Sequence, residues 1–422
     1  MKRISLFLLL FLLLKATVMY SQDGHPETNF RIVPVSPNAA SLGTFGMIPT
    51  DNYVGQANLT IPIYEIDLDG KKFPIALSYH TDGTRVAQEA TWIGLGWTLQ
   101  AGGCVVRQVQ GTDDFAARGC YNLTDAPWLT NPRFEVTDQN LEKYMGYFKG
   151  DYDAEPDMFY FNAGGHSGSM YFDVLKNNRQ LNAVPTIQTQ EKVVKMVYNT
   201  SNKTWTMTDL EGYVYSFSTK EITYYFLNTI DFFQTDITRS HIFPYYNEPQ
   251  IVTAWMLDSV TSPNGGKITF SYKKESIFTP ISTTEDVISL SKIVNGQLSS
   301  QSPQYFTNKF NYNYSYSKIE QWTLSAITFE GGKVEFGTTD REDIESAETG
   351  KKVQKLSSIK VSDTAGNLIK TTMLEYKYLL SGMAATTNGY DDRLLLSKVY
   401  DVAGSKKNNV YTLSLIHISE PT

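Results

Sequence analysis

Short runs in which apolar and polar residues alternate, separated by turn residues, recur along most of the chain. The clearest pair, residues 58–64 and 73–79, flanks Asp69 and Gly70. Asp-Gly accepts the positive φ that a two-residue hairpin turn needs, so this stretch predicts a β-hairpin. Alternation of this kind is typical of antiparallel strands with one buried face. Further strand pairs of the same type are 157–161 with 168–173, and 193–198 with 205–208.

A repeated unit begins near residue 255. Each copy has a leucine, two intervening residues, an isoleucine or valine, a polar turn with glycine and usually an alternating strand. The copies start at Leu257, Leu324, Leu356 and Leu396. A single hairpin is marginally stable in water, so the copies are expected to bury their apolar faces in one continuous sheet. The sequence therefore predicts an all-β fold, with an N-terminal antiparallel β-domain followed by stacked β-hairpins.

The two ends of the chain differ from its middle. Residues 1–21 contain Lys2, Arg3 and an apolar run, which is the layout of a secretory signal peptide. The run is shorter than the roughly 20 apolar residues that span a bilayer, and we expect no membrane span after signal cleavage. Residues 413–422 look like a translated sequencing adapter. We therefore divide the chain into a signal peptide (1–21), an N-terminal β-rich domain (22–250), a repeat segment (251–412) and this adapter-like tail (413–422).

The composition narrows the class of protein. The chain contains 27 Tyr and 22 Phe but only 19% charged residues, which favours strands. Its formal net charge is -7, and we find no cluster of Lys and Arg of the kind that phosphate binding requires. Nucleic acid is therefore excluded as a partner.

Cys104 and Cys120 are the only cysteines. In an exported protein they could pair in one disulfide that closes a short loop, or they could remain free. The sequence leaves both alternatives open because it does not give their separation.

A glycine-rich motif contains Trp92, Gly94, Gly96 and Trp97. Glycine between large apolar residues favours close approach of the backbone beneath two tryptophans, so we interpret the motif as structural core. Stacking of the two rings on sugars is the alternative interpretation.

Several motifs, taken in order, resemble the opening of YD-repeat (Rhs-like) proteins from Bacteroidetes-type bacteria. The motifs lie at residues 36–43, 55–62, 77–80, 90–99 and 155–161, and are followed by the repeats from Leu257 to Val399. The resemblance covers most of residues 30–402. The Tyr-Asp dipeptide that names the repeat occurs in a repeat at Tyr400-Asp401.

The resemblance implies a very large exported protein whose β-repeats wrap into a hollow shell. In relatives the shell often holds a C-terminal toxin or effector, which is released by self-cleavage. No position here matches the cleaving core, so we expect no enzymatic activity. We expect a structural part that starts or caps the shell of a secreted or cell-surface protein. Its partners would be the missing C-terminal repeats and effector of the same polypeptide.

Two other functions remain as alternatives. The first is an adhesin-like module that binds glycans or a partner cell, for which tyrosine-rich runs could supply an aromatic surface. These runs could equally line or cover a sheet. The second is a glycan hydrolase that uses the carboxylates of Asp82 and Glu89. A serine nucleophile is not indicated, because His166 beside Ser167 lacks the spacing of a nucleophile elbow. The tyrosines concerned are Tyr224, Tyr225, Tyr245, Tyr246, Tyr312, Tyr314 and Tyr316.

An acidic loop offers alternate carboxylates, the oxygen ligands that calcium prefers. It lacks the glycine and the distal glutamate of an EF-hand loop, so a solvated turn before a strand is the simpler interpretation. The alternative interpretation is a calcium site, and we expect no other cofactor. The acidic residues of the loop are Asp151, Asp153, Glu155 and Asp157.

Overall fold

The structure is a computed structural model that describes a large part of the chain. The described residues are 33–47, 59–79, 88–111, 113–116, 119–122, 141, 153, 155–173, 182–188, 194–230, 237, 239–244, 250–291, 293–294, 297–298, 306–379, 392–403 and 406–413. The predicted signal peptide lies outside them, as does the predicted adapter-derived tail apart from Leu413. In the described part of the chain, no helix is both long enough and apolar enough to cross a membrane.

The chain forms two compact units. The larger unit comprises residues 33–108, 159–170 and 181–422, so it includes residues on both sides of position 250. The smaller unit includes residues 109–158 and 171–180. Almost all described elements are antiparallel strands, which confirms the all-β prediction.

The predicted hairpin around Asp69-Gly70 is formed by β1 (Leu59–Leu68) and β2 (Lys71–Tyr79). Asp69 and Gly70 both have positive φ, 53° and 93°, as the two-residue turn requires. β2 also pairs with β3 (Trp97–Gln100), which completes a three-stranded sheet. Pro62 lies on β1 at the edge of this sheet, where its missing N–H costs no ladder hydrogen bond.

Two further predicted hairpins have an unbroken register. They are β5 (Met158–Ala163) with β6 (His166–Tyr171), and β9 (Val194–Asn199) with β10 (Thr204–Asp209). Along β10, half-buried and buried residues alternate strictly. This is the period of two expected of a regular strand.

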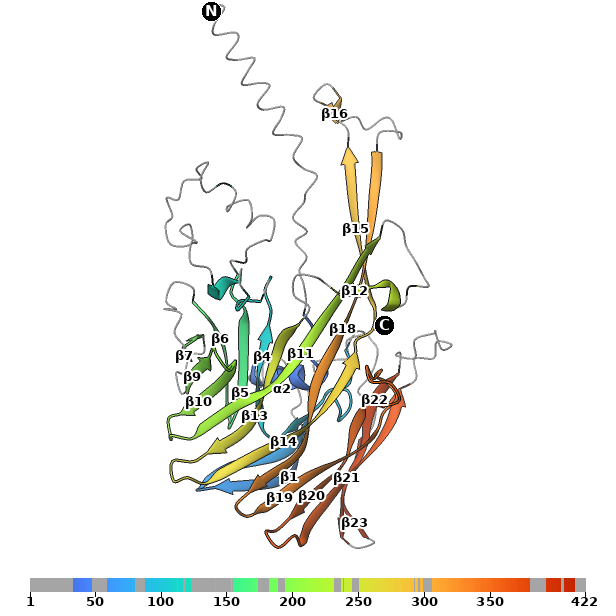
Figure 1. The fold of residues 1–422 in the computed structure, drawn as a ribbon. Coiled ribbons are helices and arrows are strands. Elements are labelled where there is room, and N and C mark those ends of the chain that lie inside the picture. The colour runs from blue at the N-terminus through green and yellow to red at the C-terminus, as the bar shows by residue number, and fades with distance from the viewer. Residues whose placement is uncertain are drawn as a thin grey trace, which may run out of the picture. The chain divides into compact units, whose positions relative to one another are not determined.

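Long strands that change partner along their length connect these hairpins to the repeats. The first half of β11 (Val214–Ile230) pairs with β13 (Ile251–Thr261), and its second half pairs with β18 (Phe306–Phe329). The first half of β18 also pairs with β15 (Ser282–Ser291), and its second half with β14 (Lys267–Phe278). Figure 1 shows β11, β14 and β18 running side by side.

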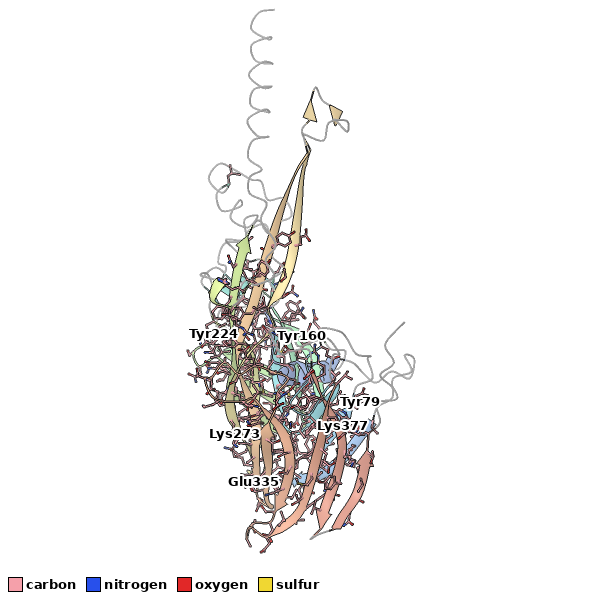
Figure 2. The ribbon with its side chains drawn as sticks, turned by 90° about the vertical axis from the view of Figure 1, so that its right-hand side faces the viewer. Tyr79, Tyr160, Tyr224, Lys273, Glu335 and Lys377 are labelled. Atoms are coloured by element: carbon pink, nitrogen blue, oxygen red, sulfur yellow. The ribbon has the colours of Figure 1, made fainter. Side chains whose placement is uncertain are left out.

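Each predicted repeat unit forms a hairpin. Three of the hairpins lie side by side in the region coloured orange to red in Figure 1, and outward-facing residues such as Lys273, Glu335 and Lys377 are exposed (Figure 2). The four hairpins are β13–β14, β18–β19 (Gly332–Asp340), β20 (Gln354–Ser362) with β21 (Leu368–Leu379), and β22 (Arg393–Ala403) with β23 (Lys406–Thr412).

The remaining described strands and turns are short. The longest of them, β4, pairs with β13. They are β4 (Gly103–Gln108), β7 (Asn182–Ala183), β8 (Thr186–Ile187), β12 (Phe243–Pro244), β16 (Ile293–Val294), β17 (Gln297–Leu298) and the 3-10 turns η1 (Cys120–Asn122) and η2 (Arg239–His241).

One helix, α2 (Pro37–Met47), was not expected from the strand pattern. The Ser36 hydroxyl accepts a hydrogen bond from the Ala39 N–H at 3.2 Å, which caps the helix, and proline at the first helical position is favourable. Ala39 packs against Cys104 and Val106 of β4 and against Met256 of β13. The helix therefore covers part of the sheet core.

Candidate functional site

The four repeat hairpins share one irregularity. In a regular strand, residues three apart face opposite sides, so Leu and Ile/Val in Leu-x-x-Ile/Val would be separated. Both are nevertheless buried in all four units. In each unit the pairing register skips the residue after the leucine, which restores the common face. The skipped residues are Asp258, Ser325, Ser357 and Ser397.

These four register breaks are β-bulges, and a bulge bends its strand and increases the local twist. Two of the bulged serines bond to the partner strand, Ser325 Oγ to the Ser271 carbonyl and Ser397 Oγ to the Glu375 carbonyl, each at 2.9 Å. At the first unit the Asp258 carboxylate accepts a hydrogen bond from the Ser218 hydroxyl at 2.6 Å. Hydrogen bonds from short polar side chains thus stabilise three of the bulges.

The Tyr400-Asp401 dipeptide has two separate roles in the last repeat hairpin. Tyr400 is buried, whereas Asp401 accepts hydrogen bonds from Thr372 at 2.6 Å and from Asn409 at 2.8 Å. Lys370 Nζ lies 3.1 Å from Asp401 and donates to the Ile63 carbonyl of β1 at 3.0 Å. Burial raises the pKa of Asp401, but these three hydrogen bonds outweigh it and lower the pKa below its usual value. The carboxylate therefore joins β21, β22 and β23.

The glycine-rich motif forms a junction, defined here as residues 90–97 together with Arg341 and Asp343. Its backbone bonds to two repeat hairpins, because the Trp92 carbonyl accepts from the Leu356 N–H at 2.9 Å and the Leu95 N–H donates to the Leu394 carbonyl at 2.8 Å. Trp92 and Trp97 are both buried.

Glycine is required at position 94 of the junction. Gly94 has a φ of 115°, a region that side-chain-bearing residues rarely adopt. A Cβ atom there would lie 2.8 Å from the Leu396 backbone nitrogen and 3.3 Å from the Leu394 carbonyl oxygen. The backbone at Gly94 therefore lies so close to β22 that no side chain fits between them.

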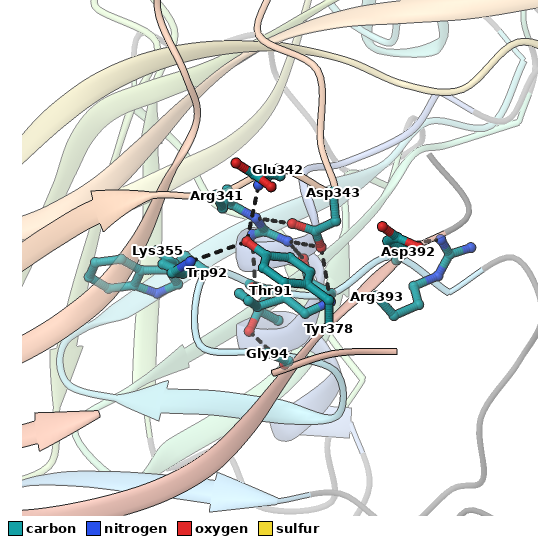
Figure 3. A network of polar contacts seen from close by, with 12 residues as sticks. Thr91, Trp92, Gly94, Arg341, Glu342, Asp343, Lys355, Tyr378, Asp392 and Arg393 are labelled. Atoms are coloured by element: carbon teal, nitrogen blue, oxygen red, sulfur yellow. Dashed lines mark hydrogen bonds and ion pairs between the residues drawn. The ribbon is translucent and has the colours of Figure 1, made fainter. Parts of the chain in front are cut away.

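A buried ion pair fixes the junction, as Figure 3 shows. Arg341 donates to both carboxylate oxygens of Asp343, at 2.8 and 2.6 Å, and to the carbonyls of Thr91 at 3.0 Å and Ala90 at 3.2 Å. Asp343 also accepts from the Leu394 N–H at 3.1 Å. Both side chains are only 2% exposed, so the pair replaces hydration entirely by protein contacts.

The tyrosines proposed as a glycan surface do not all face solvent. Tyr314 and Tyr316 are buried and pack with Ile242. Tyr316 stacks parallel on Phe226 with 4.5 Å between ring centroids. The remaining described tyrosines, Tyr224 (labelled in Figure 2), Tyr225 and Tyr312, are half-buried. Tyr245 and Tyr246 lie outside the described residues.

The acidic loop belongs to the smaller unit, and its described carboxylates bond to backbone groups there. Asp157 accepts from the Gln110 N–H at 2.7 Å, and Asp153 from the Glu155 N–H at 2.9 Å. Glu155 is exposed, and Asp151 lies outside the described residues. Among the residues that are described, no group of three or more metal-ligating side chains is placed to hold an ion.

The two cysteines are buried free thiols in the structure, Cys104 in the larger unit and Cys120 in the smaller. Burial raises the pKa of both. Of the residues considered for hydrolase chemistry, Asp82 lies outside the described residues. Burial raises the pKa of Glu89, which is beside Arg393.

Sequence reasoning identified Trp92, Gly94, Gly96 and Trp97 but missed Arg341 and Asp343. These two lie about 250 residues from the motif and carry no local signal of their partnership. The bulges had a signal, since the odd spacing of Leu-x-x-Ile/Val within a strand requires an extra residue.

No family model and no curated protein matches the chain significantly. Among solved structures, it is similar to the N-terminal domain of effector protein SpvB from Salmonella typhimurium strain LT2, with 11% identity, a TM-score of 0.38, and coverage of 82% of this chain and 99% of that one. It is also similar to TcdB2-TccC3, with 10% identity, a TM-score of 0.37, and coverage of 91% of this chain and 16% of that one. The low scores do not assign a function.

Proposed function

We propose that this chain is a non-catalytic structural part of a large secreted or cell-surface protein of the YD-repeat, Rhs-like type. In this proposal it starts or caps a β-shell, and the C-terminal repeats and effector of the same polypeptide complete the protein. The observation that carries the proposal is the same bulge in all four repeat hairpins. A bulge at a constant place in each unit bends successive hairpins alike, as a curved wall requires.

The junction supports a structural role for the earlier part of the chain. Its strongest polar groups, Arg341 and Asp343, bond to each other and to backbone groups of residues 90, 91 and 394. A buried pair held in this way has its hydrogen-bonding capacity used inside the protein. The junction therefore serves to hold the first strands against the repeats.

The adhesin alternative has less support from the tyrosines. A glycan platform requires aromatic faces open to solvent, whereas Tyr314 and Tyr316 are covered by neighbouring side chains. Tyr224, Tyr225 and Tyr312 are only half-buried, and Lys318 Nζ lies 5.2 Å from the Tyr224 ring centroid.

The test uses the complete protein. The gene is sequenced beyond the codon for Thr412, and the encoded protein is expressed and digested with increasing amounts of protease. We expect further hairpin repeats and a large resistant body that is lost in Gly94→Val. The control is Gly70→Val, where a side chain at a similar φ would meet no atom within 4 Å. A frame without further repeats, combined with glycan binding by this chain that Tyr224→Ala abolishes, would replace the proposal with the adhesin.

A further inference from the structure

A second polar cluster lies where turns of the larger unit meet. The turn between β1 and β2 contacts the turn between β10 and β11, because the Tyr213 hydroxyl donates to the Leu68 carbonyl at 3.0 Å. The turn between β5 and β6 lies against it as well, since a Cβ on Gly164 would be 2.2 Å from the Tyr215 hydroxyl. Lys71 and Asp209 lie in the middle of this cluster.

The Lys71 and Asp209 side chains are in direct contact and are shielded from water. Lys71 Nζ lies 2.5 Å from Asp209 Oδ2, with the two side chains 15% and 1% exposed. Aromatic rings surround the pair, since Nζ is 4.9 Å from the Tyr213 ring centroid and Phe73 packs 6.4 Å from both Tyr213 and Tyr215.

The Asp209 carboxyl group is held as an acyl donor would be, with its carbon open to attack by an amine. Its Oδ1 accepts from two backbone N–H groups, Tyr213 at 2.9 Å and Glu211 at 3.0 Å, an arrangement that stabilises negative charge on that oxygen. Its Oδ2 accepts from the Tyr215 hydroxyl at 3.1 Å. The two carboxylate oxygens of Asp209 therefore have different hydrogen-bond partners before any reaction.

A second carboxylate contacts the Lys71 amine and can take a proton from it. Glu211 Oε2 lies 3.0 Å from Lys71 Nζ, and its side chain is 65% exposed. His166 Nε2 is farther away, 3.8 Å from Asp209 Oδ2. Burial lowers the pKa of His166, with a further contribution from the Lys71 charge.

From this geometry we propose that Lys71 and Asp209 condense into an intramolecular isopeptide bond. Glu211 takes a proton from the Lys71 ammonium group, and the amine lone pair attacks Asp209 Cγ. The negative charge that develops on Oδ1 is held by the two N–H groups. The Cγ–Oδ2 bond then breaks, and Oδ2 leaves as water with two of the three ammonium protons, both passed through Glu211. The third proton stays on the amide nitrogen, and Glu211 ends unchanged.

The starting state is an ion pair. Burial lowers the pKa of Lys71, but hydrogen bonds to Asp209 and Glu211 outweigh it and raise the pKa above its usual value. Burial raises the pKa of Asp209, but the hydrogen bonds from Lys71 and the Tyr213 backbone outweigh it and lower the pKa below its usual value. Proton transfer to Glu211 must therefore precede attack.

The test is the intact mass of the denatured full chain, together with a tryptic map. We expect a mass lower by one water than the mature sequence, and a linked peptide pair containing Lys71 and Asp209. Lys71→Arg should restore the full mass. The matched control is Lys72→Arg, because Lys72 contacts Asp67 at 2.8 Å but both side chains are more than half exposed, and this variant should keep the linkage.

Glu211→Gln separates the reaction from folding, because an exposed side chain contributes little to the core. We expect this variant to fold but to show the full mass, or to lose water much more slowly after refolding. A wild-type protein at full mass, with Lys71 and Asp209 in separate tryptic peptides, overturns the proposal. So does a water loss that persists in Lys71→Arg.

Discussion

The regular hairpin β9–β10 and the repeat hairpins bury their apolar residues by different rules. Along β10, Trp205 and Met207 are buried two residues apart and the register is unbroken. Along β20, Leu356 and Ile359 are buried three residues apart, with Ser357 skipped. A spacing of three between buried residues in a strand therefore implies a bulge. The comparison shows that Leu-x-x-Ile/Val encodes local bending as well as burial.

Deleting one residue from each type of strand should break the comparison most clearly. Without Thr206, Trp205 and Met207 become adjacent, so one of them must turn to solvent, at a cost of roughly 5 kcal/mol or more. Without Ser357, Leu356 and Ile359 become two apart and still share a face. We expect the first deletion to unfold the chain and the second to lower its stability far less, as measured by urea denaturation. Equal losses would contradict the bulge interpretation.

The junction bonds to two of the repeat hairpins, and Arg341→Met tests how much it contributes to stability. The substitution leaves Asp343 buried without its cation and removes donors from the Ala90 and Thr91 carbonyls. Breaking a buried pair in this way costs roughly 3–5 kcal/mol. Unfolding in urea should shift accordingly.

A second variant separates charge burial from loss of contact at the junction. Arg341→Met combined with Asp343→Leu removes both charges and should recover part of the stability, since apolar replacement of a buried pair is often tolerated. A double variant as unstable as Arg341→Met alone would indicate that the bonds to Ala90 and Thr91 dominate instead.

The strand pattern was sufficient to predict many of the regular hairpins. Asp69-Gly70 located a hairpin, and the four leucine units located four more, because turns and alternation are local properties. Ser36 and Pro37 are a recognisable helix start, but helix α2 was not predicted. Its apolar residues Ala39, Ala40 and Leu42 form only a short apolar face, which gives little helical periodicity. Local patterns thus favoured the correct class but not every element.

The candidate site was predictable only in part. Gly94 and Trp92 stand out in the sequence because glycines lie between large apolar residues there. The partners Arg341, Asp343 and Leu394 are distant in the chain, and nothing in their own neighbourhoods indicates where they will pack. Likewise, Lys71 and Asp209 meet only because two hairpin turns converge.

The pH dependence of stability can sharpen the comparison on β14, which pairs with the bulged strand β18. Burial raises the pKa of Glu275 from 4.5 to about 7, despite a hydrogen bond from Gln321. The folded state therefore holds this proton more tightly than the unfolded state. Its contribution to stability is present below pH 4.5 and is lost as the pH rises through about 7.

Thermal melting of Glu275→Gln across this range is the corresponding measurement. The wild type should lose melting temperature between about pH 5 and about pH 8 more steeply than the variant, because the variant carries no titrating group there. Glu335→Gln is the control, since Lys333 lowers the pKa of that exposed residue. Identical slopes for wild type and Glu275→Gln would place the titration elsewhere.

The smallest expected effect on stability concerns the side-chain hydrogen bond at a bulge. Ser397→Ala removes the hydroxyl that donates to the Glu375 carbonyl at 2.9 Å, and a hydrogen bond of this kind contributes about 1 kcal/mol. Ser357→Ala at the equivalent position of β20 removes a hydroxyl for which the described part of the chain provides no such bond. If both serines serve only to lengthen the strand, the two variants should be equally stable in urea. A deficit confined to Ser397→Ala would mean that the bulge is encoded twice, by the leucine–valine spacing and by the side chain that holds it.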